Sequence, residues 1–264
     1  MNQPLSYVHP SAKIADNVVI EPFVTIYKNV EIGEGTWIGP NVTIMENARI
    51  GKNCKIFPGA VISAIPQDLK YEGENTEVII GDNTIIRECV TINRGTKYAY
   101  KTEIGSNCLL MSYVHIAHDC IIGDNCIIAG YAGLAGHVEV GDYVVLGGKV
   151  AVQQFVKVGD HAFVSGGTGL RKDVPPYTKA AREPVAYAGV NSVGLRRAGF
   201  TNEQINHIQD IYRLLFVRGY NTSKALQLIE AEVPASEFRD RILSFIRDSE
   251  GGIMKGFYQR NENT

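Results

Sequence analysis

The sequence has no long apolar run, little net charge and no paired cysteine motif, and each absence excludes a class of protein. No window of its 264 residues approaches the ~18 uninterrupted apolar residues of a transmembrane helix, so we expect no membrane insertion. The N-terminus lacks the basic patch and apolar stretch of a secretory signal. A formal net charge of −2 argues against nucleic-acid binding. Five cysteines without a CxxC pair are typical of reduced thiols, which predicts a cytoplasmic protein.

What the sequence does contain is a six-residue repeat. From Val8 to Leu170, 25 of the 28 residues taken at steps of six are Ile, Leu or Val. Outside the two interruptions described below, small residues such as Ala12 and Cys54 follow them by four positions, and Asn or Gly is frequent just before the small residue. This period is neither helical nor a simple alternation. It predicts a three-sided prism of short strands and turns, in which residue n lies against residue n+18 and coils pair as parallel strands.

The repeat also divides the chain. Two polar interruptions, at about 63–77 and 95–103, preserve the register and predict loops that leave the prism. The repeat fades near residue 176, and from about residue 191 the apolar period becomes helical. The predicted fold is mainly β: a parallel β-helix of hexapeptide repeats over 1–190, followed by a C-terminal α-helical domain over 191–264.

Steps of three hexapeptides, one full coil each, predict which side chains share an edge of the prism. His118, Gly136 with His137, and Gln154 form one outer column that combines an imidazole, an unhindered backbone N–H and polar side chains. A second column on another edge contains almost no side chains. It either forms a shallow groove for a long apolar ligand, or its glycines serve only to satisfy the backbone angles of the turns. Its members are Ser112, Gly130, Gly148 and Gly166.

A metal site is the main alternative for the histidine column. His115, His118 and His137 could supply imidazoles to zinc, as in a zinc-dependent hydratase. However, Gly136 rather than a histidine stacks over His118, so we expect no metal.

Several ordered motifs resemble those of the UDP-N-acetylglucosamine O-acyltransferases, the first enzymes of lipid A biosynthesis and members of the hexapeptide-repeat acyltransferase superfamily. The resemblance covers nearly the whole chain, including both loops and the helical tail. The matching segments are Gln67–Tyr71, Arg87–Thr96, His115–Cys120, Leu134–Val138, Asp173–Tyr177 and Gly189–Arg197.

This resemblance implies a left-handed β-helix and a homotrimer with active sites between adjacent prisms. It implies transfer of a 3-hydroxyacyl group from the phosphopantetheine of acyl carrier protein to the 3-hydroxyl of UDP-N-acetylglucosamine, without a separate cofactor. His118 matches the general base, Asp119 the residue that orients it, and Gly136 the backbone N–H that binds the thioester oxyanion.

The resemblance also assigns the substrate contacts. Asn191 and Arg197 match positions near the nucleotide and the phosphopantetheine. Gly166 matches the position that limits acyl length, and Phe163 closes the far end of the acyl site. The residues that match substrate-positioning residues are Gln67, Asp68, Lys70, His115, His137 and Gln154. Departures from the pattern of some members, which affect nucleotide affinity and acyl preference, are Gln153, Pro184 and Val193.

Alternatives of other kinds stay open at this point. A related N-acyltransferase should carry an additional N-terminal uridine-binding domain, for which a repeat starting at Val8 leaves no room. A hexapeptide scaffold that only binds nucleotide or acyl carrier protein is the non-enzymatic alternative. Residues 170–225 carry nine Lys and Arg against four acidic residues, which favours a dock for an acidic partner or a nucleotide phosphate. Acyl length and the choice between a hydroxyl and an amino acceptor are not fixed by the sequence.

Overall fold

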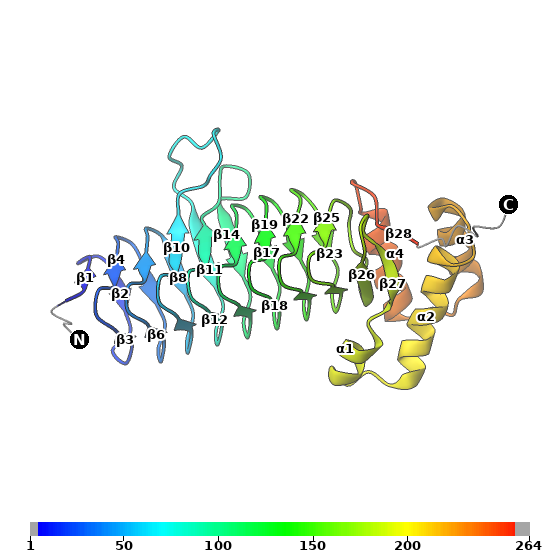
Figure 1. The fold of residues 1–264 in the computed structure, drawn as a ribbon, viewed down its shortest axis with the longest axis horizontal. Helices are drawn as coiled ribbons and strands as arrows, with labels where there is room; N and C mark the ends of the chain where they lie inside the picture. The colour runs from blue at the N-terminus through cyan, green and yellow to red at the C-terminus, as the bar shows by residue number, and fades with distance from the viewer. Residues whose placement is uncertain (1–4, 257–264) are drawn as a thin grey trace.

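Residues 5–256 are described by the computed structural model, and most of them wind into a three-sided prism with helices at its C-terminal end (Figure 1). Successive strands belong to three sheets in turn, so that each full coil contributes one strand to each face. The coils pair in parallel through backbone hydrogen bonds. The predicted parallel β-helix is therefore confirmed.

The strands of each face are as follows. Sheet 1 contains β1 (Tyr7–Val8), β4 (Thr25–Ile26), β7 (Thr43–Ile44), β10 (Val61–Ala64), β13 (Thr91–Asn93), β16 (His115–Ile116), β19 (Gly133–Leu134), β22 (Ala151–Val152) and β25 (Gly169–Leu170). Sheet 2 contains β2 (Lys13–Ile14), β5 (Glu31–Ile32), β8 (Ala48–Ile50), β11 (Glu77–Ile80), β14 (Lys101–Ile104), β17 (Ile121–Ile122), β20 (Glu139–Val140) and β23 (Lys157–Val158). Sheet 3 contains β3 (Val19–Ile20), β6 (Trp37–Ile38), β9 (Lys55–Ile56), β12 (Ile85–Ile86), β15 (Leu109–Leu110), β18 (Ile127–Ile128), β21 (Val145–Leu146), β24 (Phe163–Val164), β26 (Thr178–Ala181), β27 (Ala186–Val190) and β28 (Lys255–Gly256).

Register across the coils follows the predicted step of three hexapeptides except at the two loops. Ile32 pairs with Ile50, three hexapeptides later, but Ile50 pairs with Ile80, five hexapeptides later, and Ile80 with Ile104, four hexapeptides later. The extra lengths are whole hexapeptides, so every aliphatic side chain keeps its place. The strands extend into the ends of both predicted loops, because β10 runs to residue 64 and β14 begins at residue 101.

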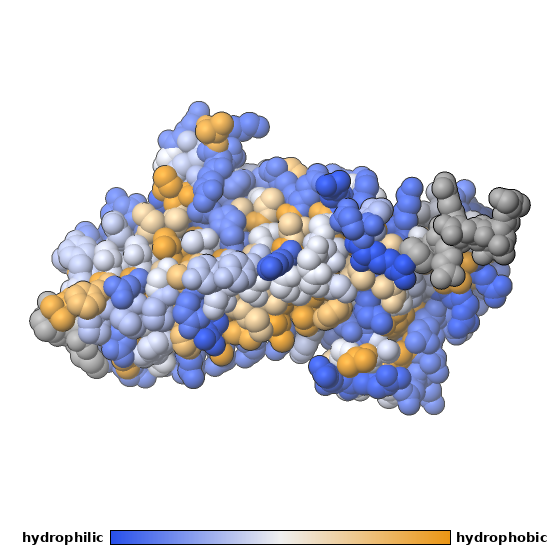
Figure 2. Space-filling model, viewed as in Figure 1, coloured by the Kyte–Doolittle hydropathy of each residue, from blue (hydrophilic) through white to orange (hydrophobic). Residues whose placement is uncertain are grey.

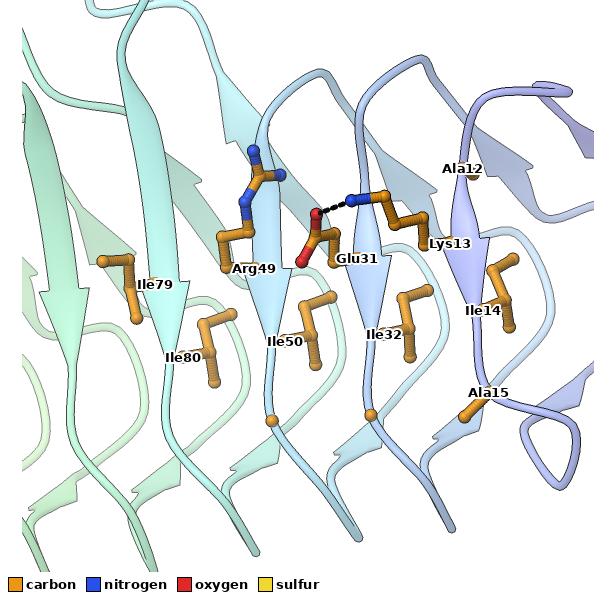
Figure 3. Close-up of a pocket in the computed structure, with 12 residues that line it drawn as sticks. Ala12, Lys13, Ile14, Ala15, Glu31, Ile32, Arg49, Ile50, Ile79 and Ile80 are labelled. Atoms are coloured by element: carbon orange, nitrogen blue, oxygen red, sulfur yellow. Dashed lines mark hydrogen bonds and ion pairs between the residues drawn. The ribbon is translucent and has the colours of Figure 1, made fainter.

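The core is built from columns of stacked aliphatic side chains. On sheet 2, Ile14, Ile32, Ile50 and Ile80 lie one above another on successive strands and point inward (Figure 3). The alternate residues point outward, where Lys13 donates to the Glu31 carboxylate at 2.8 Å. Burial of one large aliphatic per strand supplies the main driving force, at roughly 1.5–3 kcal/mol for each side chain removed from water.

Each edge of the prism is a turn that needs a left-handed backbone angle. Asn residues adopt positive φ there, for example Asn41 at 58° and Asn125 at 58°, because Asn tolerates this region better than most residues. The edges are named here by the sheets they join: 1–2, 2–3 and 3–1. Both loops leave the prism from the 1–2 edge, since each connects a strand of sheet 1 to a strand of sheet 2.

The C-terminal part closes the prism. β26 continues sheet 3 in parallel, and β27 then turns back antiparallel to it. Four helices follow: α1 (Ser192–Arg197), α2 (Asn202–Phe216), α3 (Thr222–Glu232) and α4 (Glu237–Arg247). The capping box of Thr201 and Gln204 begins α2, and the buried Tyr212 hydroxyl donates to the Pro176 carbonyl at 2.5 Å. The expected prism over 1–190 includes residues 1–4, and the expected helical domain over 191–264 includes residues 257–264; both segments lie outside the described residues. Among residues 5–256, no helix combines the length and apolar character needed to cross a bilayer.

The inward columns predict a difference between neighbouring isoleucines. Ile122 is 1% exposed in the core, whereas Ile121 is 43% exposed on the outer face of the same strand. We expect Ile122→Ala to lower the free energy of unfolding by about 2–4 kcal/mol and Ile121→Ala by less than about 1 kcal/mol. Urea unfolding of both variants measures the difference. Equal losses would contradict the assigned orientation of the strand.

Candidate active site

The predicted histidine column lies on the 1–2 edge. His118 and Asp119 occupy the turn between β16 and β17, Gly136 and His137 the next turn, and Gln154 the turn after that. The stacking is direct, because the His137 N–H donates to the His118 carbonyl at 3.1 Å and the Phe155 N–H to the Gly136 carbonyl at 3.3 Å. His118 is outside the aliphatic core but is only 7% exposed.

Gly136 is required by the ring that lies against it. A Cβ atom at this position would lie 2.5 Å from Cε1 and 2.8 Å from Nε2 of His118, well inside contact distance. No other residue type fits without moving the imidazole. The Gly136 N–H donates to no acceptor among the described residues. The turn therefore presents a free donor beside the imidazole.

The His118 ring is held by the carboxylate next to it. His118 Nδ1 lies 2.7 Å from Asp119 Oδ2. An ionised carboxylate only accepts hydrogen bonds, so Nδ1 carries the proton and Nε2 has the lone pair in the neutral ring. Within residues 5–256 the only hydrogen bond of this ring is the one through Nδ1. Nε2 is thus available to accept a proton.

Asp119 is buried and fully hydrogen-bonded. Besides His118, it accepts from the Thr96 hydroxyl at 2.7 Å, the Thr96 N–H at 2.9 Å and the Ala99 N–H at 3.1 Å. Its own N–H donates to the Thr102 hydroxyl oxygen at 2.9 Å. The carboxylate therefore fastens the second loop to the prism as well as orienting the imidazole.

The environment of Asp119 favours its charged form. Burial alone would raise the pKa of this carboxyl, but the hydrogen bonds from His118, the Thr96 hydroxyl and two backbone N–H groups outweigh burial and lower the pKa. Asp119 is consequently an anion at neutral pH.

His137 lies in an aromatic cluster above this pair. Its ring stacks on Phe155 with centroids 4.5 Å apart and meets the edge of Tyr98 at 4.4 Å and of His118 at 5.0 Å. Burial lowers the pKa of His137, while the charges of Asp119 and Asp68 act in the opposite direction. His137 Nδ1 is buried without a hydrogen-bond partner, 3.9 Å from Asp119 Oδ2.

The same three residues form a potential metal donor set. Ligand atoms of His118, Asp119 and His137 lie within 4.8 Å of one another, whereas His115 takes no part and instead bonds to the Thr91 hydroxyl at 2.7 Å. Sequence reasoning considered a set with His115 and did not include Asp119. Asp119 Oδ2 already accepts from both Thr96 and His118, so a metal would have to displace those donors.

The other predicted contacts of the 1–2 edge surround this site. Gln67, Asp68 and Lys70 lie on the first loop, where the Lys70 N–H donates to Asp68 at 3.0 Å. His115 lies on the outer face of sheet 1, and burial lowers its pKa. Gln154 is exposed above Gly136. The described fold thus brings these polar groups to one edge.

The remaining predicted residues lie on the other two edges. Asn191 is the N-cap of α1 and donates to the His161 carbonyl at 2.8 Å on the 2–3 edge; Arg197 is exposed at the end of the same helix. Gly166 is on the 3–1 edge, where a Cβ would lie 3.0 Å from the Gly148 oxygen, and Phe163 is on the outer face of sheet 3 nearby. One chain does not bring these residues together with His118.

Sequence reasoning missed the groups that complete the His118 environment. Thr96 was noted only as part of a motif, and neither Thr102 nor Tyr98 was assigned a role. Phe155 could have been found, because it follows His137 by one full coil of the repeat. Thr96 and Tyr98 could not, because the conformation of a loop does not follow from the repeat.

A bacterial transferase hexapeptide profile matches residues 29–64 and 101–136, and a profile described as UDP-N-acetylglucosamine O-acyltransferase, domain 2, matches residues 173–254. The chain belongs to the acyl-[acyl-carrier-protein]–UDP-N-acetylglucosamine O-acyltransferase family and is an enzyme.

Individual relatives support this assignment. The family member of Sulfurihydrogenibium sp. is 56% identical over 251 residues, covering 95% of this chain and 93% of the relative. That of Chlorobaculum parvum is 59% identical over 198 residues, 75% of each chain. The crystal structure of the UDP-N-acetylglucosamine acyltransferase of Bacteroides fragilis superimposes with a TM-score of 0.95 at 50% identity, covering 97% of this chain and all of that one. The fold is thus the left-handed parallel β-helix of hexapeptide repeats with a C-terminal helical domain.

The charged state of Asp119 predicts a pH-dependent stability difference. Because its pKa is lowered on folding, Asp119 stabilises the fold above its unfolded pKa of about 4, and that stabilisation is lost as pH falls through the folded pKa. We expect Asp119→Asn to cost about 1–3 kcal/mol at pH 7, because an amide cannot accept from all four donors.

The gap in Tm between the two proteins should narrow as pH falls below about 4, where Asp119 becomes protonated. Differential scanning fluorimetry across this range measures it. A gap that does not change with pH would show that the charge of Asp119 contributes nothing.

Proposed function

We propose that this chain transfers a 3-hydroxyacyl group from acyl carrier protein to the 3-hydroxyl of UDP-N-acetylglucosamine, the first step of lipid A biosynthesis. The single observation that carries the proposal is the orientation of His118, whose Nδ1 is fixed by Asp119 and whose Nε2 is left with a lone pair beside the free Gly136 N–H. The names of the relatives give acyl-[acyl-carrier-protein] as the donor and UDP-N-acetylglucosamine as the acceptor of an O-acyl transfer.

In the proposed reaction His118 acts as the general base. Nε2 takes the proton of the sugar hydroxyl while its oxygen attacks the carbonyl carbon of the thioester. The Gly136 N–H donates to the oxyanion that develops on that carbonyl. When the C–S bond breaks, the imidazolium returns the proton to the phosphopantetheine sulfur. The Asp119 anion stabilises the imidazolium between these steps, and no metal or further cofactor takes part.

Surrounding polar residues would position the acceptor. Burial keeps His137 neutral at pH 7, so this ring can offer a hydrogen bond without adding a charge. Gln67, Asp68 and Lys70 reach the same edge from the first loop, and His115 and Gln154 flank it. Their common location on the 1–2 edge supports a role in binding the sugar and its diphosphate.

The distribution of the predicted residues over three edges supports a homotrimer. The edges of one prism point away from one another, so a site that uses His118, Asn191 and Gly166 has to combine residues of adjacent chains. Apolar patches run along the body of the prism (Figure 2). The outward side chains of sheet 3 are mostly apolar, which suits a contact between copies; they include Val19, Trp37, Ile85, Leu109, Ile127, Val145 and Phe163.

Acyl length is assigned to the 3–1 edge in this proposal. Three glycines, Gly130, Gly148 and Gly166, stack there with no side chains between the coils. A Cβ on any of them would lie 3.0–3.3 Å from the carbonyl oxygen of the residue one coil earlier in the same column. A groove along these glycines would admit a long hydroxyacyl chain, with Phe163 at its end.

Five free thiols accord with the reducing cytoplasm, where we place the enzyme.

The role of His118 predicts the effect of its removal. We expect His118→Ala to reduce kcat by about 10²-fold or more with an unchanged oligomeric state, because a general base contributes this much. His9→Ala, at the far end of the prism, serves as the control and should retain full activity. Mass spectrometry of the product from UDP-N-acetylglucosamine and a mixture of hydroxyacyl carrier proteins measures both turnover and acyl length.

The same assay separates the proposed function from its alternatives. An ester product, cleaved by mild base, identifies a hydroxyl acceptor, whereas a base-stable amide from a 3-amino sugar would identify the other acceptor. Near-normal turnover of His118→Ala would remove His118 from the mechanism. Binding of both substrates without any product would favour the scaffold alternative.

Sharing of the site between chains predicts complementation. His118→Ala and Arg197→Glu chains, each inactive as a homotrimer, should regain activity when they are co-expressed in equal amounts. In a cyclic trimer every mixed assembly retains one intact site, so about a quarter of wild-type activity is expected. Sedimentation velocity checks the trimer. Failure of the mixture to exceed the separate variants would mean that both residues serve a site within one chain.

A further inference from the structure

Thr96 makes a directed hydrogen bond to the carboxylate of the His118 pair. It is 6% exposed, and its hydroxyl lies 2.7 Å from Asp119 Oδ2. The same hydroxyl oxygen accepts the Tyr98 N–H at 3.2 Å. A hydroxyl has one proton, so accepting from Tyr98 directs that proton to Asp119. His118 Nδ1 donates to the same oxygen at 2.7 Å, and a continuous chain of hydrogen bonds therefore runs from the second loop to the imidazole.

We propose that Thr96 is a positioning residue that acts on His118 through Asp119. The Thr96 hydroxyl occupies one side of Asp119 Oδ2 and leaves the other side to His118. Its hydrogen bond also compensates part of the negative charge of the carboxylate. The consequence for turnover rests on the proposed function, but the consequence for the titration of His118 does not.

The direction of the effect follows from the charge on Oδ2. With the Thr96 hydroxyl in place, two donors share this oxygen, and the proton stays on the imidazole rather than moving to the carboxylate. Without it, the negative charge on Oδ2 is compensated less, so it stabilises the imidazolium more strongly and the pKa of His118 rises. Thr96 thus limits how strongly the carboxylate holds the imidazolium, and it favours return of the proton to the leaving sulfur.

Few other charges face the ring. Asp119 lies on its own turn and His137 on the next coil, and the charge of Asp68 on the first loop acts on His137. The cations of the second loop are engaged elsewhere, Lys97 with Glu72 at 3.7 Å and Lys101 with Glu103 at 2.5 Å. A change at Thr96 therefore reaches His118 chiefly through Asp119.

The experiment is an NMR titration of His118 in the full-length protein without substrate. Histidine labelled with ¹³C at Cε1 gives one signal for each of the six His, and the signal missing from His118→Ala is assigned to residue 118. Thr96→Val removes the hydroxyl at nearly constant volume, and Thr96→Ser restores it. Thr102→Val is the matched control, because Thr102 is equally buried and contacts the Asp119 N–H but not the carboxylate.

We expect Thr96→Val to raise the pKa of His118 by about half a pH unit, with Thr96→Ser and Thr102→Val close to wild type. The acidic limb of the kcat/KM profile should move by the same amount, with roughly tenfold lower activity at the optimum. An unshifted titration in folded Thr96→Val, or an equal shift in Thr102→Val, would overturn the proposal and leave Thr96 as a structural tether.

If Thr96→Val does not fold, Thr96→Cys, whose thiol is a weaker donor, should give a smaller shift in the same direction. No shift in that variant would count against the proposal equally. A chain that titrates as expected but transfers no acyl group would contradict the proposed function and not the role of Thr96.

Discussion

Vertical stacking of equivalent residues, one coil apart, is the constraint on which the rest of the molecule depends. Each inward aliphatic side chain lies against another from the neighbouring coil, so the prism is a set of continuous aliphatic columns with no separate core for each element. Parallel pairing of such short strands is weak for any one strand. It becomes stable because each coil buries its face against two neighbours, as in other repeat proteins. The same register that stacks Ile116 on Leu134 also brings Gly136 against His118.

The candidate site lies where the repeat is interrupted without losing its register. Both insertions add whole hexapeptides between sheet 1 and sheet 2, and so they emerge on the edge that carries His118. The second loop then returns to the prism through the Asp119 carboxylate. Gly95 permits this return, since a Cβ there would lie 2.3 Å from the Lys101 backbone. The rigid columns determine the position of the imidazole, and the loop completes its surroundings.

The contrast between the periodic prism and its non-repeating loops explains how much of the fold and of the candidate site the sequence could predict. The order of the sheets, the inward isoleucines, the stacking of His118 on Gly136 and the separate glycine edge are all consequences of period six, and each was predicted. The hydrogen bonds of Thr96 and the contact of Tyr98 with His137 depend on the path of a non-repeating loop, and no periodic pattern encodes them. Asn191 illustrates a further limit. Its side chain caps α1 and bonds to His161, which the resemblance alone did not reveal.

The buried carboxylate also accounts for why the pair suits proton transfer better than metal binding. An unpaired anion at 3% exposure would be costly, and Asp119 avoids this cost with four donors, of which His118 is one. When His118 is neutral, the pair carries a single negative charge. When His118 is protonated, the pair is neutral overall, so the carboxylate's charge is balanced in the state that the proposed reaction requires. A divalent cation would instead need Oδ2, which Thr96 and His118 already occupy, and it would deprive the imidazole of the partner that determines its tautomer. The donors that make burial of Asp119 tolerable therefore include the His118 Nδ1–H, and this hydrogen bond determines the tautomer in which Nε2 carries the lone pair.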